Sequence, residues 1–339
     1  MFEEILPGIY RIEVPIPDNP LQTVNSYLLR GKEEDLIIDT GVDNEESSVV
    51  LLSALHKIGA KMDNINIFIT HLHYDHFGLA ASLASNGSKI YLNARDAMFL
   101  GDANLEERDL IHGRLNGFPY GELQEANKNR DDVLNNLLIE DIKKSFEERT
   151  ENALPEKQLF QLIGDGDTLH VGEYSLRCVM TPGHSSGHLC LYEANNKILF
   201  SGDHILEGIT PAVFLWPGEK RNPLKEYLNS LDKVFNMEIN NVLPGHRSSF
   251  QDYRGRISQI KAHHYAREEE IASVLDTKGK SAYQIASKVS WSISESWDRF
   301  ASELKWMALA ETLAHLNYME ENGRIKSKLQ SDRVIHYYL

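Results

Sequence analysis

The sequence predicts an α/β fold in which helices cover β-sheet, followed by a smaller, mostly helical C-terminal domain. Three observations support this expectation. Strand-like runs alternate with turns and helices between Ile9 and Leu92, the strand pattern returns between Phe160 and Pro244, and after Ser248 nearly every segment has a helical pattern. The chain of 339 residues is also long enough for about two domains.

In the first part of the chain, short strands end at turn residues such as Pro15 and the polar segment Gly31–Glu34. Apolar residues three positions apart predict a helix over Glu45–Ile58, and a second helix is expected at Leu79–Leu83. The strands expected here are Ile9–Val14, Asn25–Arg30, Asp35–Asp39, Ile65–Thr70 and Ile90–Leu92.

An insertion at about residues 101–156 separates this part from the next strands; it is polar, acidic and helical in propensity. The later strands are expected at Leu169–Val171, Tyr174–Met180, His188–Tyr192, Lys197–Phe200 and Val242–Pro244, with a helix at Leu224–Phe235. The C-terminal helices are expected at Ile257–Val274, Ser281–Lys288, Trp297–Leu316 and Tyr318–Glu321, followed by a weak strand at Arg324–Leu329. We therefore expect a catalytic domain at 1–254 and a helical domain at 255–339.

Composition narrows the class of protein. The hydrophobic content of 42% and charged content of 25% are ordinary for a globular chain. No apolar run reaches the ~18–20 residues of a membrane helix, and the N-terminus lacks a signal-peptide pattern, so we expect no membrane partner and a cytoplasmic location. The formal net charge of −15 disfavours broad nucleic-acid binding. The two cysteines exclude a cysteine-based zinc module, so a metal must be held by histidine and carboxylate.

The strongest motif is a cluster of metal-ligating residue types directly after a predicted strand. His71 and His73 are two residues apart and therefore share one side of an extended segment, and Asp75 and His76 follow at a turn into a helix. Four ligating side chains within six residues fit a pair of adjacent metal sites better than a single site.

Three later loops each present one further ligand after a strand end. The segments are Thr181–His184, Ser201–Asp203 and Leu243–His246, in which small residues precede His184, Asp203 and His246. Loops at strand ends are where sites on α/β scaffolds gather. Each loop alone is a weak signal, but together with the first motif they predict one site.

These residues resemble the signature of the metallo-β-lactamase superfamily, H-x-H-x-D-H followed by a single His, a single Asp and a single His. The resemblance implies the αβ/βα sandwich, with two β-sheets face to face and helices outside. It also implies one metal held by His71, His73 and His184, and a second held by Asp75, His76 and His246 with Asp203 bridging. Asp39 matches a recurrent aspartate of the family that orients a ligand histidine; a plain turn aspartate is the alternative.

The chemistry expected of two adjacent cations is hydrolysis by a bridging hydroxide, which attacks an electrophile that the metals polarise. Asp75 and Asp203 are the expected catalytic carboxylates. Zinc is the first choice of metal, and iron or manganese also suit these ligands. Tyr74 is within reach of a substrate, or it packs in its loop.

Two functions remain open. The segments from Phe200 to His246 resemble the branch that contains glyoxalase II and the lactamase-beta-like endoribonuclease, and the C-terminal segment resembles that branch's winged-helix-like domain. The first function is hydrolysis of a small ester, thioester or lactone, which the charge favours. The alternative is metal-dependent cleavage of single-stranded RNA, which the C-terminal resemblance keeps open. A winged-helix interaction module on an inert fold is disfavoured by the seven intact ligands.

The insertion has two interpretations of its own. The first is a lid over the metal site. The tip of this lid, Gly113–Gly121, combines flexible glycines with Phe118 and Tyr120, which are expected to line an apolar pocket, and Arg114 is expected to pair with an anionic part of a substrate. The alternative is a surface arm that joins two copies of the chain into a homodimer.

Overall fold

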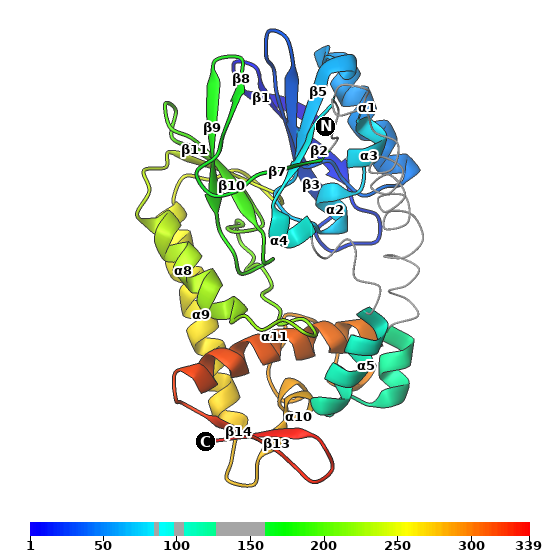
Figure 1. The fold of residues 1–339 in the computed structure, drawn as a ribbon, viewed down its shortest axis with the longest axis vertical. Coiled ribbons are helices and arrows are strands. Elements are labelled where there is room, and N and C mark those ends of the chain that lie inside the picture. The colour runs from blue at the N-terminus through cyan, green and yellow to red at the C-terminus, as the bar shows by residue number, and fades with distance from the viewer. Residues whose placement is uncertain (85–87, 98–104, 127–159) are drawn as a thin grey trace. The chain divides into compact units, whose positions relative to one another are not determined.

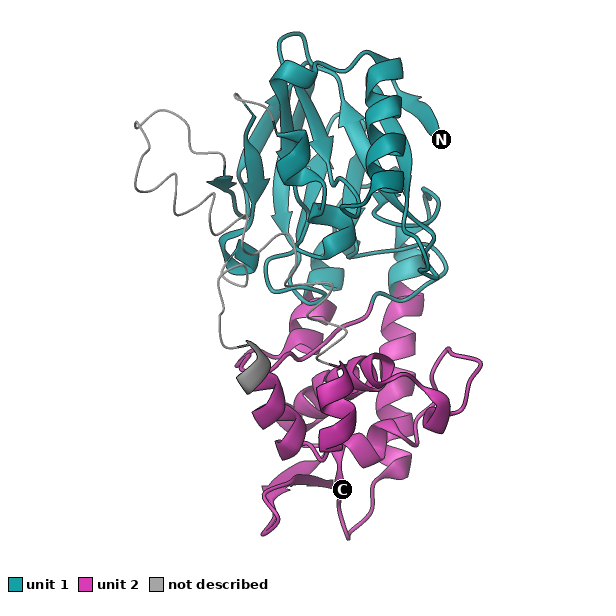
Figure 2. Cartoon of the chain, turned by 90° about the vertical axis from the view of Figure 1, so that its right-hand side faces the viewer, with its two compact units in different colours: residues 1–101, 141–211, 230–257 teal, residues 102–140, 212–229, 258–339 magenta. Residues whose placement is uncertain are grey.

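Two β-sheets packed face to face form the larger part of the protein, which confirms the predicted α/β fold (Figure 1). The structure is a computed structural model that describes residues 1–84, 88–97, 105–126 and 160–339. The chain forms two compact units, coloured separately in Figure 2. Unit 1 comprises residues 1–101, 141–211 and 230–257, and unit 2 comprises residues 102–140, 212–229 and 258–339.

The first sheet of unit 1 has seven strands in chain order. They are β1 (Phe2–Leu6), β2 (Ile9–Pro15), β3 (Thr23–Leu29), β4 (Asp35–Ile38), β5 (Ile65–Phe68), β6 (Ile90–Leu92) and β7 (Phe160–Leu162). The pairs from β1 to β4 are antiparallel, and those from β4 to β7 are parallel. The carboxyl ends of parallel strands meet at one edge, where ligand sites of open α/β sheets lie.

The second sheet has five strands in the order β12-β11-β10-β9-β8. They are β8 (Thr168–Val171), β9 (Tyr174–Met180), β10 (Leu189–Glu193), β11 (Ile198–Gly202) and β12 (Asn241–Pro244). Only the β11–β12 pair of this sheet is parallel. The loops after β9, β11 and β12 are those that the sequence predicts to carry ligands.

A hydrophobic core lies between the two sheets. Ile38 and Phe68 of the first sheet belong to the same buried cluster as Leu191 and Phe200 of the second. The rings of Tyr27 and Phe200 meet edge to face with their centres 5.3 Å apart. Because side chains alternate across a strand, every second residue of these strands enters this core.

Helix α1 (Glu45–Ile58) packs against β2. Asn44 caps its first turn by accepting a hydrogen bond from Ser47 N, and Gly59 ends it in the left-handed conformation at φ 79°. The shorter helices of unit 1 are η1 (Met62–Asn64), α2 (Tyr74–Phe77), α3 (Ala80–Leu83) and α4 (Ala94–Ala97). Helices α8 (Pro223–Phe235) and α9 (Tyr253–Val274) contribute residues to both units.

Unit 2 combines helices with a small antiparallel sheet in the order β13-β15-β14. Its further elements are α5 (Leu105–Leu115), β13 (Lys280–Ser281), α10 (Ala282–Ala286), η3 (Trp297–Arg299), α11 (Ser302–Glu321), β14 (Lys326–Leu329) and β15 (Ile335–Tyr338). Its core includes Phe118, Ile271, Ile285, Trp306 and Leu313. No helix of the described residues is long and apolar enough to cross a membrane.

Several elements differ from the sequence prediction. Strands β1, β13 and β15 were not expected, and the two helices expected at Trp297–Leu316 and Tyr318–Glu321 are one helix, α11. The small sheet was difficult to predict because β13 has two residues and all four residues of β14 are exposed. Neither strand therefore shows the alternation of buried and exposed residues that indicates a strand.

The described part of the predicted insertion, residues 105–126, lies in unit 2. Phe118, which we expected to line an apolar pocket, is instead buried in the core of that unit, with its ring 5.3 Å from that of Trp306. Residues 101–104 and 127–156 of the insertion lie outside the described residues. The lid and the dimer arm therefore stay predictions.

Candidate metal centre

The segment after β5 carries four of the seven predicted ligands. His71 is the third residue after the strand, and His73 is the extended N-cap residue of α2, at φ −77° and ψ 145°. The chain then turns into α2, so Asp75 and His76 occupy its first turn. Because the backbone changes from extended to helical, the side chains of His71 and His73 approach the site from a different direction than those of Asp75 and His76.

The other three ligands come from loops that follow strands of the second sheet. His184 follows β9, Asp203 follows β11 and His246 follows β12. Gly245 lets two of these loops approach closely, because a Cβ at that position would lie 2.6 Å from Asp203 Oδ1 and 2.7 Å from the His76 ring. Glycine is the residue that permits such an approach.

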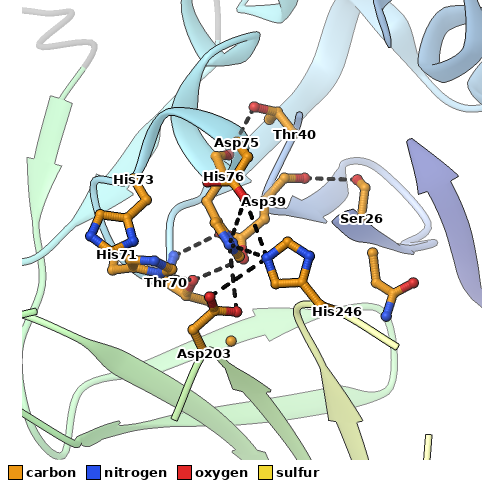
Figure 3. A network of polar contacts seen from close by, with 12 residues as sticks. Ser26, Asp39, Thr40, Thr70, His71, His73, Asp75, His76, Asp203 and His246 are labelled. Carbon is orange, nitrogen blue, oxygen red and sulfur yellow. Dashed lines mark hydrogen bonds and ion pairs between the residues drawn. The ribbon is translucent and has the colours of Figure 1, made fainter. Parts of the chain in front are cut away.

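The structure brings all seven predicted residues together in three overlapping groups of potential metal ligands. The groups are His71, His73 and His184; His71, His76 and Asp203; and Asp75, His76 and His246. Within each group the ligand atoms lie within 4.8 Å of one another. Figure 3 shows His76, Asp203 and His246 pointing toward one another from separate segments.

The histidine nitrogens and carboxylate oxygens of the seven residues lie close enough together to bind shared metal ions. His73 Nδ1 lies 3.0 Å from His184 Nε2, and His76 Nε2 lies 3.3 Å from His246 Nε2. Asp203 reaches both pairs, with Oδ2 3.6 Å from His184 Nε2 and 3.5 Å from His246 Nε2. Asp75 Oδ2 lies 3.2 Å from His246 Nε2.

The donor set fits divalent metal ions. His71 Nε2 and Asp203 Oδ1 are buried and have no hydrogen-bond partner among the described residues. A buried polar atom without a partner is costly, and a metal ion would satisfy both atoms. Imidazole and carboxylate are also the ligands that zinc, iron and manganese accept.

Hydrogen bonds on the far side of three rings direct their Nε2 atoms toward the centre. His76 Nδ1 donates to Asp39 Oδ2 at 2.7 Å, and His246 Nδ1 donates to the Thr23 carbonyl at 2.7 Å. Thr70 donates its hydroxyl to Asp39 Oδ2 at 2.8 Å, so its oxygen accepts from His71 Nδ1 at 3.0 Å. In each ring Nδ1 is occupied by this bond, so Nε2 is the atom that would bind a metal, which at His76 would replace a proton.

The protonation of the site is set by burial and by its charges. Burial, together with His184, lowers the pKa of His73 to about 3, so this ring is neutral at neutral pH. Burial opposes ionisation of Asp203, but the neighbouring histidines, His246 first, hold its pKa well below the ordinary value. Burial likewise disfavours charge on His76, but Asp39 and then Asp203 raise its pKa well above normal. The carboxylates therefore make this site attractive to positive charge.

Two further residues support the site: Thr70, which the sequence analysis did not single out, and His188, for which its position beside a ligand loop favoured a structural role. Thr70 links Asp39 to His71, as described above. His188 Nε2 accepts a hydrogen bond from Asp203 N at 3.1 Å, and His188 Nδ1 contacts Thr181 Oγ1 at 2.8 Å. In the sequence, the feature that could have indicated this role is the position of His188 four residues after His184. Tyr74, by contrast, donates its hydroxyl to the backbone oxygen of Asp43.

Comparison with known proteins places the chain in a family. Residues 20–246 match the metallo-beta-lactamase superfamily. The chain therefore belongs to this superfamily, as the sequence resemblance predicted, and it is a hydrolase.

Curated relatives of this chain carry hydrolase and lactamase-like names. A "Beta-lactamase-like protein 2 homolog" of Drosophila melanogaster is 26% identical over 94% of this chain and 89% of its own length. The "Acyl-coenzyme A thioesterase MBLAC2" of Homo sapiens is 25% identical over 67% of this chain and 74% of its own length. An atrochrysone carboxyl ACP thioesterase of Cryptosporiopsis is 22% identical over 97% of this chain and 84% of its own length.

Solved structures match over nearly the whole chain. A metallo-beta-lactamase family protein from Thermus thermophilus is 29% identical with a TM-score of 0.70, and it covers 99% of both chains. A beta-lactamase domain protein from Burkholderia ambifaria is 26% identical with a TM-score of 0.77, and it covers 100% of this chain and 94% of that one. The fold of this protein is therefore that of the superfamily.

Proposed function

We propose that this protein is a dinuclear metal-dependent thioesterase that cleaves acyl thioesters such as those of coenzyme A. The observation that carries the proposal is the set of seven buried or half-buried ligands, which form three overlapping groups, with Asp203 in the group that shares His71 with one and His76 with the other. The thioesterase names of two relatives favour thioesters over the other small esters and lactones that such a site can hydrolyse.

The ligands proposed for each of the two cations follow from which side chains lie close together. His71, His73 and His184 would hold one, and Asp75, His76 and His246 would hold the other. Asp203 is proposed to bridge them, because its carboxylate lies 3.5–3.6 Å from a nitrogen of each group. Zinc is the proposed metal, with iron or manganese as alternatives.

When bound, the two cations supply a water of lowered pKa and polarise the carbonyl oxygen under attack. The chain's own residues prepare that chemistry. Asp75 and Asp203 are ionised at neutral pH, since the neighbouring histidines outweigh burial and lower the pKa of Asp75 to about 2. These carboxylates hold negative charge at the centre of the site and orient the attacking water, while Asp39 and Thr70 keep two Nε2 lone pairs directed inward.

A cysteine of the chain is disfavoured as the nucleophile. Cys178 and Cys190 are buried, and burial raises the pKa of each thiol to about 12. A thiolate is therefore scarce at neutral pH, and attack by water fits the site better.

Unit 2 is proposed to contain a winged-helix-like domain, corresponding to the predicted domain at 255–339. Its three-stranded sheet begins with β13, between α9 and α10, and ends with the β14–β15 hairpin after α11. Segment 255–339 has 12 Lys and Arg against 11 Asp and Glu, so it lacks the charge excess that phosphate contacts require. We therefore place thioesters ahead of RNA.

The test compares substrates and variants in one series. Chelated protein and protein reloaded with Zn²⁺, Fe²⁺ or Mn²⁺ are assayed on an acyl-coenzyme A, a nitrophenyl ester, a lactone and single-stranded RNA. We expect metal-dependent cleavage of the thioester, and loss of both metal and turnover in His71→Ala and Asp203→Ala. His56→Ala, at an exposed histidine of α1, is the matched control and should keep both.

Two results would contradict the proposal. Cleavage of RNA without cleavage of any thioester would establish the nuclease alternative. Full metal content in Asp203→Ala would remove the bridging role of Asp203.

A further inference from the structure

Asp96 is a buried carboxylate of α4 that is not among the seven ligands, and its side chain accepts four hydrogen bonds. Oδ2 accepts from the backbone N of Leu72 at 3.3 Å and from Ser185 Oγ at 2.8 Å. Oδ1 accepts from the backbone N of Gly187 at 2.5 Å and from Ser186 Oγ at 3.3 Å. The residue is only 3% exposed.

These donors belong to the two segments that carry the three-histidine group. Leu72 lies between His71 and His73, and Ser185 follows His184 directly. One carboxylate therefore ties together two loops that are more than a hundred residues apart, as shown by the separation of 111 positions between His73 and His184.

The loop after His184 is also fitted closely to Asp96 by its backbone. A Cβ added at Gly187 would lie 2.7 Å from both the backbone N and Oδ1 of Asp96. Only glycine permits this approach without displacement of the loop. The contact therefore depends both on the Asp96 carboxylate, which accepts the hydrogen bond, and on the missing Cβ of Gly187, which permits the approach.

The other half of the site has a different carboxylate. Asp39 accepts from Thr70 N at 2.9 Å and from His76 Nδ1 at 2.7 Å. Asp39 thus orients a histidine of the second group directly. Asp96 contacts the backbone and hydroxyl groups next to the histidines of the first group.

We propose that Asp96 is a positioning residue that holds the His71–His73 segment and the His184 loop at the spacing needed to bind a cation. It acts on the three-histidine group alone, whereas Asp39 supports His76 of the second group directly and His71 of the first group through Thr70. This inference rests on the metal assignment under Proposed function.

The test measures metal binding in Asp96→Asn and Asp96→Ala, with His184→Ala as the reference for loss of the first cation. Elemental analysis and titration of Zn²⁺ into chelated protein give stoichiometry and affinity without any activity assay. We expect wild-type protein to bind two ions, and the Asp96 variants to bind one as wild type does and the other about 10–100-fold more weakly. Asp39→Asn should weaken the ion of the second group, which Asp39 supports directly at His76, and also affect the first through Thr70 and His71.

Turnover provides a second readout. With excess Zn²⁺ the kcat of Asp96→Asn should recover toward wild type, whereas His184→Ala should not recover. Because bound metal also stabilises the folded state, urea unfolding of the chelated variant beside chelated wild type identifies a folding defect. Asp96→Asn is nearly isosteric, so it keeps the test valid if Asp96→Ala does not fold.

The outcomes separate this inference from the function. If wild-type protein fails to bind two ions, the metal assignment itself is wrong. If wild type binds two ions and both Asp96 variants bind two with unchanged affinity, only the role of Asp96 is overturned.

Discussion

Thr70 shows how a single uncharged side chain controls the site. Its hydroxyl can donate only one hydrogen, which goes to Asp39, so its oxygen must accept from His71 Nδ1. The tautomer of His71 therefore depends on Thr70, and the pattern of hydrogen bonds also connects His71 to His76 through the shared Asp39 carboxylate.

At this scale we expect Thr70→Val to weaken metal binding by about tenfold, because His71 loses the acceptor that fixes its tautomer. Valine has the shape of threonine, so packing is retained and the backbone bond from residue 70 to Asp39 remains. Zn²⁺ titration of chelated protein measures the effect. Thr70→Ser restores the hydroxyl and should restore affinity; equal affinity in Thr70→Val and wild type would contradict the role.

At the scale of elements, helices α9 and α11 of unit 2 meet at two buried histidines. His264 Nδ1 lies 3.2 Å from His315 Nε2, and His315 Nδ1 donates to the backbone oxygen of Glu311. His315 Nε2 must then accept from His264. Both rings are completely buried, and burial lowers the pKa of His315 to about 4.

This pair predicts a loss of stability in acid. The pKa of His315 in the folded protein lies below its unfolded value of 6.5, so stability is full above pH 6.5 and falls as the pH drops toward 4. Protonation would also place a second donor opposite His264 Nδ1. Between pH 7.5 and pH 5, we expect the free energy of unfolding to fall by about 2 kcal/mol less in His315→Gln than in wild type.

Urea unfolding of chelated protein at the two pH values checks this prediction, because chelation removes the competing titration of metal-bound histidines. His56→Gln, at an exposed histidine of α1, should keep the wild-type pH dependence. If the free energy of unfolding falls equally in His315→Gln and wild type, the protonation of His315 does not govern unfolding in acid.

At the scale of the whole chain, the candidate metal centre draws its ligands from segments of both sheets of unit 1. His71 follows β5 of the first sheet, whereas Asp203 and His246 follow strands of the second. A ligand that binds only the folded state stabilises it. Bound metal should therefore stabilise unit 1 as a whole rather than one loop.

We expect chelation to lower the Tm of wild-type protein, since metal at a hundred times its Kd stabilises the folded state by about 2.7 kcal/mol. Asp203→Ala should show a smaller shift because its ligand set is incomplete. Calorimetry with and without chelator measures both. An unchanged Tm in chelated wild type, with loss of metal verified, would contradict a stabilising role.

Local pattern was enough to predict much of unit 1. Helix α1 has apolar residues at helical spacing and strong caps at Asn44 and Gly59, so its predicted and observed bounds agree. The small sheet of unit 2 was only partly predicted, because the exposed residues of β14 carry no alternating pattern. Its pairing with β15 is decided by contacts between strands rather than by local propensity.

The sequence by itself determined the superfamily, the α/β class and the seven candidate ligands, because His71, His73, Asp75 and His76 form a dense local motif and the other three each follow a strand end. The family resemblance also indicated Asp39 as an aspartate that orients a ligand histidine, but only the tertiary structure identified its partner and the role of Asp96. Asp96 contacts residues 24 to 91 positions away, and Asp39 contacts His76 37 positions away. Such hydrogen bonds depend on how distant loops pack. The residues next to an aspartate in the sequence do not indicate which distant group it will contact. The burial of Phe118 against Trp306 has the same cause: an aromatic residue predicts burial, but only the folded chain selects the surface that covers it.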